Sequence, residues 1–521
     1  MNRQERIRFL GDVASVGAAL GPDDTAIVYG PRRLTFADLD ERSNRFANGL
    51  RAEGISSQSR IAMLDRNSEC YFDVMFGAPK ANVVLVTINF RLTRPEISYI
   101  LSDSNAEMLF VGKEFAAIAT QLAGELPALK KIVVVDGQGD TGYEHWLASQ
   151  AATPVEGVAI RPNDAAVQMY TSGTTGNPKG VELSHSAMTN AARVGLEVWP
   201  FLYESASAVL GTMPLFHIAA FNLCIAALCA GARAEIVRDA TPEELADIIP
   251  DHGISLVPLP AAVIHALLRM ESTRTKDFGS LKVMLIAGSG IAVELLREAG
   301  ETFDCGFALS YGSTEMCGGI SYLGPGECTP DAGKRLQSAG RLLPHSEVRI
   351  VDARGGELPV GEVGEIMVRS NRLMTCYWNR PEATAEALRD GWFHSGDAGY
   401  LDEGGYLYIT DRIKDMVLSG GENVYPAEVE KAMFAHPAVE DVAVIGVPDE
   451  KWGESLLAFV VLKRGVQAPT TGEFIEFLRG NLAGFKIPRR YEFVDAFPRN
   501  AMGKVLKRTL REPFWQGRGK D

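Results

Sequence analysis

Residues 171–180, Thr-Ser-Gly-Thr-Thr-Gly-Asn-Pro-Lys-Gly, combine four hydroxyl side chains, three glycines and one lysine directly after an apolar run at 165–170. Glycines let backbone N–H groups approach an anion closely, hydroxyls donate further hydrogen bonds, and the lysine adds a positive charge. A second strand-like run follows at 180–183. The stretch therefore predicts a phosphate-binding loop between two strands. A flexible linker is the weaker interpretation, because a linker needs neither Pro178 nor Lys179.

The spacing within this loop argues against a P-loop NTPase. A Walker loop has four residues between its first glycine and a Gly-Lys-Ser/Thr triplet. Here Gly173 is followed by Gly176, and Lys179 precedes a glycine. The loop instead resembles the signature of the adenylate-forming superfamily, which comprises acyl-CoA synthetases, luciferases and the adenylation domains of peptide synthetases.

The bulk composition is that of a soluble globular protein with two to four domains in 521 residues. A net charge of −14 argues against nucleic acid or an anionic membrane as the main partner. Seven cysteines without any CxxC pair indicate reduced thiols rather than a disulfide framework or a zinc site. The first six residues lack the apolar region of a signal peptide. We therefore expect a cytoplasmic protein.

One uncharged segment, residues 205–232, is long enough to span a bilayer. Pro214, His217 and Asn222 interrupt it, however, and its first half is rich in Ser, Thr and Gly. A buried strand, a loop and a buried helix explain the segment better than a membrane span.

Strand-like runs alternate with helical patterns along the first three hundred residues, which predicts an α/β fold with two helix-covered, mostly parallel sheets. A helix capped by Thr35 is expected at 34–55. The expected strands are residues 60–64, 83–86, 108–111, 131–135, 208–210, 234–237, 255–258 and 283–286.

The pattern of predicted secondary structure changes after Gly340. Short β-type segments at 348–352 and 364–368 predict a small β-rich subdomain. Beyond Asp415, a helix at 427–434 and strands at 442–445 and 457–461 predict a compact α+β domain. We place an N-terminal adenylation domain at residues 1–411 and a small mobile domain at 412–521.

Two further motifs carry groups that suit a nucleotide. Residues 311–315, Tyr-Gly-Ser-Thr-Glu, offer an aromatic ring for a base, a hydroxyl for a phosphate and a carboxylate for Mg²⁺. Taken alone such a turn is usually structural, but it resembles the superfamily's adenine-and-magnesium motif. The resemblance implies that Tyr311 and Gly312 contact the nucleotide, Thr314 contacts the acyl phosphate and Glu315 binds the metal.

Residues 392–397, Trp-Phe-His-Ser-Gly-Asp, end in an aspartate that can accept both hydroxyls of a ribose. The superfamily more often shows Tyr, a basic residue, Thr, Gly and Asp here. The sequence therefore departs from the pattern at 393–395 and keeps Asp397.

An interdomain linker is predicted at the charged bend 411–415 and the glycine turn that follows it. The resemblance to the superfamily agrees in part with this interpretation. It implies that Arg412 contacts the nucleotide, Lys414 is the hinge, and Ser419, Gly420 and Gly421 line the CoA channel. Some relatives carry a lysine at the position of Leu418, so no role in thioester formation is assigned there.

A lysine near the C-terminus, Lys504, stands on a turn in the frame Pro-x-x-x-x-Gly-Lys at 498–504. It matches the superfamily's catalytic lysine, which implies that it bridges the substrate carboxylate and the α-phosphate. A mobile cation would lower the repulsion between these two anions.

The acyl pocket is assigned to the apolar stretch at 214–222 and to small residues elsewhere. His217 is either a core histidine or, by the resemblance, a residue at the mouth of the pocket. An amino-acid substrate would need an aspartate here, and the stretch has none, so an uncharged acyl tail is favoured. A short dicarboxylate is disfavoured because no cation is evident. The expected pocket residues are His217, Ala219, Phe221, Gly288 and Gly318.

The motifs occur in family order over 171–504, and the resemblance covers essentially the whole chain. It implies an acyl-CoA synthetase that uses ATP, Mg²⁺ and CoA and forms an acyl-adenylate from a fatty, aromatic or ring-bearing monocarboxylate. Delivery to a carrier protein or another acceptor is one alternative, and an inactive nucleotide-binding homologue is another. A homodimer is left open. The phosphate contacts are assigned to Thr171, Ser172, Gly173, Thr174, Thr175 and Lys179.

Overall fold

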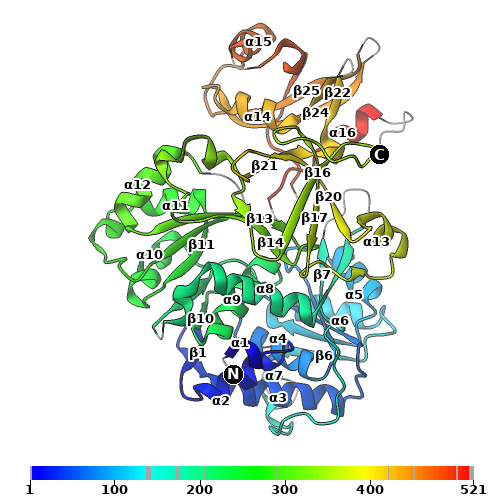
Figure 1. The fold of residues 1–521 in the computed structure, drawn as a ribbon. Helices are drawn as coiled ribbons and strands as arrows, with labels where there is room; N and C mark the ends of the chain where they lie inside the picture. The colour runs from blue at the N-terminus through cyan, green and yellow to red at the C-terminus, as the bar shows by residue number, and fades with distance from the viewer. Residues whose placement is uncertain are drawn as a thin grey trace. The chain divides into compact units, whose positions relative to one another are not determined.

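The computed structural model describes residues 3–135, 142–171, 177–204, 206–287, 291–419, 422–449, 452–480, 482–499 and 503–515 (Figure 1). These residues form two compact units. The first lies within Met1–Gly173, Asn177–Glu347 and Arg369–Gly391, and the second within Val348–Val368 and Trp392–Asp521. Each unit is a group of residues that pack against one another. Such packing does not show whether a mobile domain begins at residue 412, so that boundary stays a prediction.

The first unit is built on two sheets. The larger has nine strands, in the spatial order β15 (Arg341–Leu342), β14 (Gly318–Leu323), β13 (Gly306–Ser313), β12 (Val283–Ala287), β11 (Leu256–Pro260), β9 (Ala208–Gly211), β10 (Arg233–Ile236), β1 (Thr25–Tyr29), β2 (Arg32–Thr35). The other has seven, in the order β18 (Cys376–Tyr377), β8 (Lys179–Ser184), β7 (Ala165–Thr171), β4 (Val84–Thr87), β3 (Arg60–Leu64), β5 (Met108–Gly112), β6 (Lys131–Val135).

The central pairs of both sheets are parallel, and the pairs at the edges that carry β2, β14, β15, β8 and β18 are antiparallel. Strands β3, β4 and β5 are buried along their whole length, as expected when helices cover both faces of a parallel sheet. All eight expected strands of this region are present. The predicted α/β class is therefore confirmed.

Helices flank these sheets; α10, α11 and α12 lie in succession beside β11 (Figure 1). The expected helix at 34–55 is α3, and Thr35 caps it through a capping box with Asp38. The helices of this unit are α1 (Arg3–Arg6), α2 (Asp12–Leu20), α3 (Phe36–Ala52), α4 (Cys70–Lys80), α5 (Arg94–Ser104), α6 (Ala116–Ala123), α7 (Tyr143–Ala148), α8 (His185–Val198), α9 (Ile218–Ala230), α10 (Pro242–Asp251), α11 (Ala261–Leu268), α12 (Val293–Phe303), α13 (Pro381–Ala387).

The uncharged segment at 205–232 folds as expected into the buried strand β9, a loop and the helix α9, whose side chains are mostly buried. Within the described residues, no helix has the length and apolar character needed to cross a membrane.

The described residues of the second unit form two β-sheets and three α-helices. The predicted β-rich subdomain is formed by β16 (Ser346–Val351), β17 (Gly364–Ser370), β20 (Trp392–Leu401) and β21 (Leu407–Arg412), while the short β19 (Leu388–Arg389) belongs to the first unit. The predicted α+β region contains β22 (Val417–Ser419), β23 (Glu422–Val424), β24 (Val439–Asp449), β25 (Gly453–Leu462), β26 (Arg490–Phe493), α14 (Pro426–Phe434), α15 (Thr471–Arg479) and α16 (Lys507–Trp515). Both predictions are confirmed.

Candidate active site

The phosphate loop is predicted between two strands, and the structure describes the strands on either side of it. Thr171 is the last residue of β7, Lys179 is the first of β8, and the two are partners in the antiparallel register. Ser172, Gly173, Thr174 and Thr175 lie outside the described residues.

A carboxylate from a distant motif joins the base of this hairpin. The Oγ1 of Thr171 donates to Oε1 of Glu315 at 3.3 Å, and the hydroxyl of Tyr377 donates to the same oxygen at 3.1 Å. The ammonium of Lys179 lies 4.9 Å from the centroid of the Tyr377 ring, a cation–π contact. The structure thus brings together three residues assigned to phosphate and metal binding.

The donor set around Glu315 fits a magnesium ion that is shared with a nucleotide. Both hydrogen bonds that this carboxylate accepts from described residues go to Oε1, and none of these residues donates to Oε2. The described chain also contains no group of three or more His, Cys, Asp or Glu side chains that could enclose a metal by themselves. Mg²⁺ characteristically takes one or two carboxylates together with substrate phosphates.

Tyr311 and Gly312 lie at the end of β13, and Thr314 stands in the turn that leads into β14. The two strands approach each other closely at Gly312, where a Cβ atom would come within 1.9 Å of the carbonyl oxygen of Gly318. Glycine is required at position 312 for this reason. The amide of Cys317 donates to the carbonyl of Thr314 at 2.9 Å and closes the turn.

In the second unit, Asp397 of β20 and Arg412 of β21 are cross-strand partners, and their side chains form an ion pair at 2.5 Å. The residues at which the sequence departs from the family pattern support this strand. His394 contacts Glu365 at 3.0 Å, and the Ser395 hydroxyl donates to the carbonyl of Ile366 at 2.6 Å. The substitutions at 394 and 395 therefore have structural partners of their own, and Asp397 lies within β20.

Lys504 belongs to the same charged neighbourhood of the second unit. Burial and the nearby Arg412 lower the pKa of Lys504, and Asp397 and Asp415 oppose that shift. Burial also lowers the pKa of Lys414 to about 8, again against the field of Asp415. The predicted catalytic lysine, hinge lysine and ribose carboxylate are thus gathered in one place within this unit. Ser419 is buried in β22, and Gly420 and Gly421 lie outside the described residues.

The pKa of Lys414 predicts how the stability of the protein depends on pH. The unfolded state holds this proton up to about pH 10.5 and the native state releases it near pH 8, so the free energy of unfolding should rise across that window. Urea unfolding across this window should show a smaller rise for Lys414→Met than for the unchanged protein. Lys463→Met, at an exposed position in the same unit, is the matched control and should keep the full rise. An unchanged rise in Lys414→Met would contradict the assignment.

A cavity of about 240 Å³ in the first unit lies between α8, α9 and the strands β12 to β14. Ala219 and Gly318, two of the residues assigned to the acyl pocket, are among its lining residues. His217 and Phe221 are not among its lining residues, so their assignment to the acyl pocket stays a prediction, and Gly288 lies outside the described residues. His217 precedes α9 and is largely buried, and burial lowers its pKa to about 4. It is therefore neutral at pH 7.

The sequence model described as AMP-binding enzyme matches residues 16–378, and the one described as AMP-binding enzyme C-terminal domain matches residues 428–504. The chain belongs to the AMP-binding enzyme family.

Several proteins similar to this AMP-binding enzyme have been named. A fatty acid–[acyl-carrier-protein] ligase of Streptomyces coeruleorubidus is 39% identical over 98% of this chain and 97% of its own. A feruloyl-CoA synthase of an Amycolatopsis species is 37% identical over 95% and 97%, respectively. Among solved structures, the O-succinylbenzoate CoA synthetase of Bacillus subtilis in complex with ATP and magnesium ion has a TM-score of 0.83, with 30% identity over 96% and 98% of the two chains.

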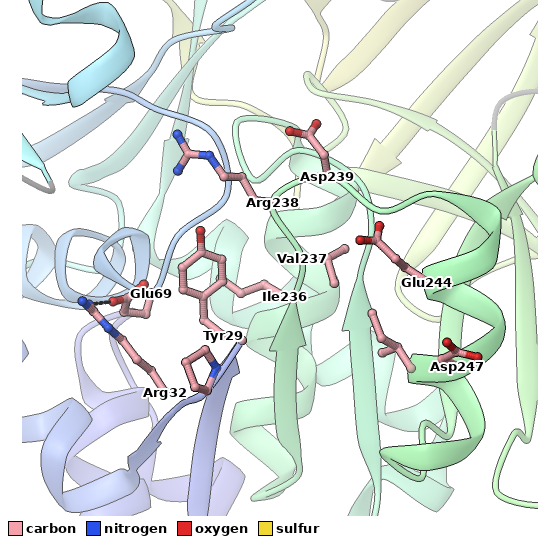
Figure 2. A pocket seen from close by; sticks show the side chains of 12 residues that line it. Tyr29, Arg32, Glu69, Ile236, Val237, Arg238, Asp239, Glu244 and Asp247 are labelled. Carbon is pink, nitrogen blue, oxygen red and sulfur yellow. Dashed lines mark hydrogen bonds and ion pairs between the residues drawn. The ribbon is translucent and has the colours of Figure 1, made fainter.

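A second cavity of this AMP-binding enzyme, of about 560 Å³, lies beside the ends of β1 and β10 (Figure 2). Its charged side chains already have partners: Arg32 pairs with Glu69, Asp239 with Arg66, and Asp247 with Lys276. Its lining residues include none of the predicted site residues. We assign no function to this cavity.

Sequence reasoning missed several residues that the structure adds to the site. Tyr377 joins Glu315 because β18 pairs with β8, and no local pattern indicates that pairing. Trp199 and Tyr322, joined by a hydrogen bond at 3.0 Å, line the 240 Å³ cavity. Arg372 also lines this cavity. A single arginine at the start of the mostly apolar stretch 372–378 does not indicate a cavity wall in the sequence.

Proposed function

We propose that this AMP-binding enzyme is an ATP-dependent acid–CoA ligase, which forms acyl-CoA, AMP and pyrophosphate through an acyl-adenylate. The observation that carries the proposal is continuity between two sites of the first unit. Gly312 and Gly318 line the 240 Å³ cavity, and Thr314 and Glu315 occupy the turn between them. The carboxylate of an acid bound in the cavity would therefore lie next to the phosphates of a nucleotide bound at the turn.

The first half-reaction requires positioning and charge neutralisation more than proton transfer. A carboxylic acid is already ionised at pH 7 and can attack the α-phosphate directly, with pyrophosphate as the leaving group. Glu315 would hold Mg²⁺, which neutralises phosphate charge when bound. Thr171 and Lys179, with the loop hydroxyls that follow Thr171, would hold the departing pyrophosphate. Lys504 would bridge the two reacting anions.

The second half-reaction would use the residues of the other unit. Asp397 and Arg412 suit the ribose and the nucleotide, and Lys414 is placed at the beginning of the segment that the sequence predicts to be mobile. We infer that residues 412–521 rotate about Lys414 and that Ser419, Gly420 and Gly421 then line the path of CoA, whose thiol displaces AMP. A cytoplasmic location and a homodimer also remain predictions.

The size of the cavity limits the acid. A cavity of about 150 Å³ is enough for benzene, so 240 Å³ accommodates a substituted ring or a chain of similar bulk. Two of the relatives support a ring-bearing acid, since they are named for ferulate and O-succinylbenzoate. A medium-length or ring-bearing acid is thus favoured over a long chain.

The proposal is tested by pyrophosphate exchange into ATP in the presence of a panel of acids, followed by detection of the CoA ester. We expect exchange without CoA, and AMP and acyl-CoA when CoA is added. Absence of exchange with every acid would contradict the proposal and favour a nucleotide-binding protein without activity.

A carrier protein is the second candidate acceptor, because the relative with 39% identity is named as an acyl-carrier-protein ligase. The two acceptors can be compared in the same assay, with CoA in one arm and a phosphopantetheine-bearing carrier protein in the other. Exchange without CoA-ester formation, together with acylation of the carrier, would assign the acceptor to the carrier protein.

Filling the cavity should weaken binding of the acid and leave ATP binding intact. Ala219 lines the cavity from the first turn of α9, where a tryptophan would occupy much of its volume. We expect Ala219→Trp to raise the KM for a ring-bearing acid by at least about tenfold, because overpacking displaces the ligand. Steady-state kinetics should show an unchanged KM for ATP, which serves as the internal control. Equal effects on both substrates would contradict the placement of the acid.

A further inference from the structure

Three side chains that line the 240 Å³ cavity each carry a buried polar atom without a hydrogen-bond partner among the residues that the structure describes. These atoms are Nε of Arg372, Oγ of Ser313 and Oδ1 of Asn222. A buried polar atom without a partner is unfavourable, and native structures rarely leave one unexplained. Three of them around one cavity indicate that its occupant supplies their partners.

The three side chains are gathered around one short segment, residues 317–319. Arg372 donates through Nη1 to the carbonyl of Gly319 at 2.7 Å, and Asn222 donates through Nδ2 to the carbonyl of Cys317 at 2.8 Å. Ser313 is the strand partner of Gly318. Each side chain is thus held beside the same part of the cavity wall.

Arg372 carries a positive charge that lacks a carboxylate partner within the described residues. The side chain is almost fully buried, and its Nη2 donates to the hydroxyl of Ser346 at 2.6 Å. Cys317 lies close to it, but burial raises the pKa of this thiol to about 12, so it is neutral at pH 7. Glu197, the nearby carboxylate, has a half-exposed side chain that faces His345 at 3.8 Å. A buried positive charge without a carboxylate partner is stabilised when a ligand supplies an acceptor oxygen.

The unpartnered atoms also define the chemistry of that oxygen. Because Nδ2 of Asn222 donates to a carbonyl, the remaining Oδ1 is an acceptor and requires a donor. Nε of Arg372 is a donor and requires an acceptor. A hydroxyl group can both accept from Arg372 and donate to Asn222, whereas a carboxylate can only accept and leaves Asn222 without a donor.

We propose that the acid activated by this enzyme carries a hydroxyl group on its tail, and that Arg372, Asn222 and Ser313 bind this hydroxyl inside the cavity. The inference rests on the proposed function for the placement of the acid's tail. It adds that the cavity selects a hydroxylated acid over its unsubstituted analogue, because a site built to bond a hydroxyl rejects the analogue that leaves its polar groups unpaired.

The test compares three matched acids: 3-phenylpropanoate, 3-(4-hydroxyphenyl)propanoate and 3-(4-carboxyphenyl)propanoate. Dissociation constants from calorimetry and kcat/KM for pyrophosphate release are measured for each. We expect the hydroxylated acid to bind at least about tenfold more tightly than the unsubstituted one and to be used with a correspondingly higher kcat/KM. Equal values for these two acids, or preference for the dicarboxylate, would overturn the inference.

Binding and turnover separate this inference from the proposed function. Tighter binding of the hydroxylated acid without pyrophosphate release would overturn the proposed function and leave the hydroxyl site standing. Pyrophosphate release at equal rates from the hydroxylated and unsubstituted acids would support the proposed function and overturn the hydroxyl site.

Two variants test the residues themselves. Ser313→Ala removes a hydroxyl that has no partner, so it should fold normally and lower the preference for the hydroxylated acid. Arg372→Met should reduce that preference towards one, with an unchanged KM for ATP as the sign that the rest of the site is intact. A preference that survives in Ser313→Ala as well as in Arg372→Met would overturn the assignment.

Discussion

Replacing Lys504 by alanine is expected to lower the rate of pyrophosphate release by at least about a hundredfold, because the cation that we propose to stabilise the two approaching anions is lost. Lys504 lies in the field of Asp397, the predicted ribose ligand, and of Arg412, the predicted nucleotide ligand. We propose that a cation beside these two nucleotide ligands acts on the α-phosphate that they would hold. Pyrophosphate exchange into ATP measures this half-reaction in isolation.

The same variant should differ in its second half-reaction, the formation of the thioester. When acyl-AMP is provided directly, CoA should still consume it in Lys504→Ala, because the carboxylate and phosphate are already joined. Arg508→Ala is a matched control from the same region, since Arg508 is half-exposed and pairs with Glu512 within α16. This control should retain both half-reactions. Loss of both half-reactions in Lys504→Ala would contradict the assignment of the lysine to the first step.

The parts of the fold that follow from local pattern could be predicted from the sequence. The runs at 60–64 and 131–135 are apolar over a strand length and became β3 and β6. The loop at 171–180 could be placed between strands because apolar residues flank it on both sides. Local pattern did not reveal β1 and β2, which join the nine-stranded sheet beside β10, some two hundred positions later in the sequence. Such long-range pairing depends on tertiary packing.

The same distinction explains which site residues were found. Lys179, Glu315 and Asp397 lie in motifs that offer groups for phosphate, metal or ribose and that also resemble the motifs of the superfamily. Tyr377 enters the site only through the pairing of β18 with β8, and Arg372 enters the cavity wall through its bond to the carbonyl of Gly319. Neither has a local signature, because a single aromatic residue or arginine near a strand has many structural explanations. The inference about the acid's tail therefore depended on the three-dimensional structure and could not be made from the sequence.

Glu315→Gln should lower pyrophosphate exchange by about a hundredfold or more, because the charge that we propose to hold Mg²⁺ beside the phosphates is lost. The substitution is close to isosteric. The amide oxygen of a glutamine can still accept from Thr171 and Tyr377, so the base of the hairpin should keep its hydrogen bonds. Exchange measured across a range of Mg²⁺ concentrations should show a higher metal requirement as well as a lower maximum rate.

Tyr377→Phe separates the charge of Glu315 from its hydrogen bonding. This variant removes the bond at 3.1 Å to Oε1 and leaves the carboxylate, its charge and its contact with Thr171 in place. The phenylalanine ring also keeps the face on which Lys179 rests. A small loss of rate with an unchanged Mg²⁺ requirement is therefore expected, in contrast to Glu315→Gln. If the two variants shared the same magnesium dependence, Glu315 would act by orienting the hairpin and the metal would have to be held elsewhere.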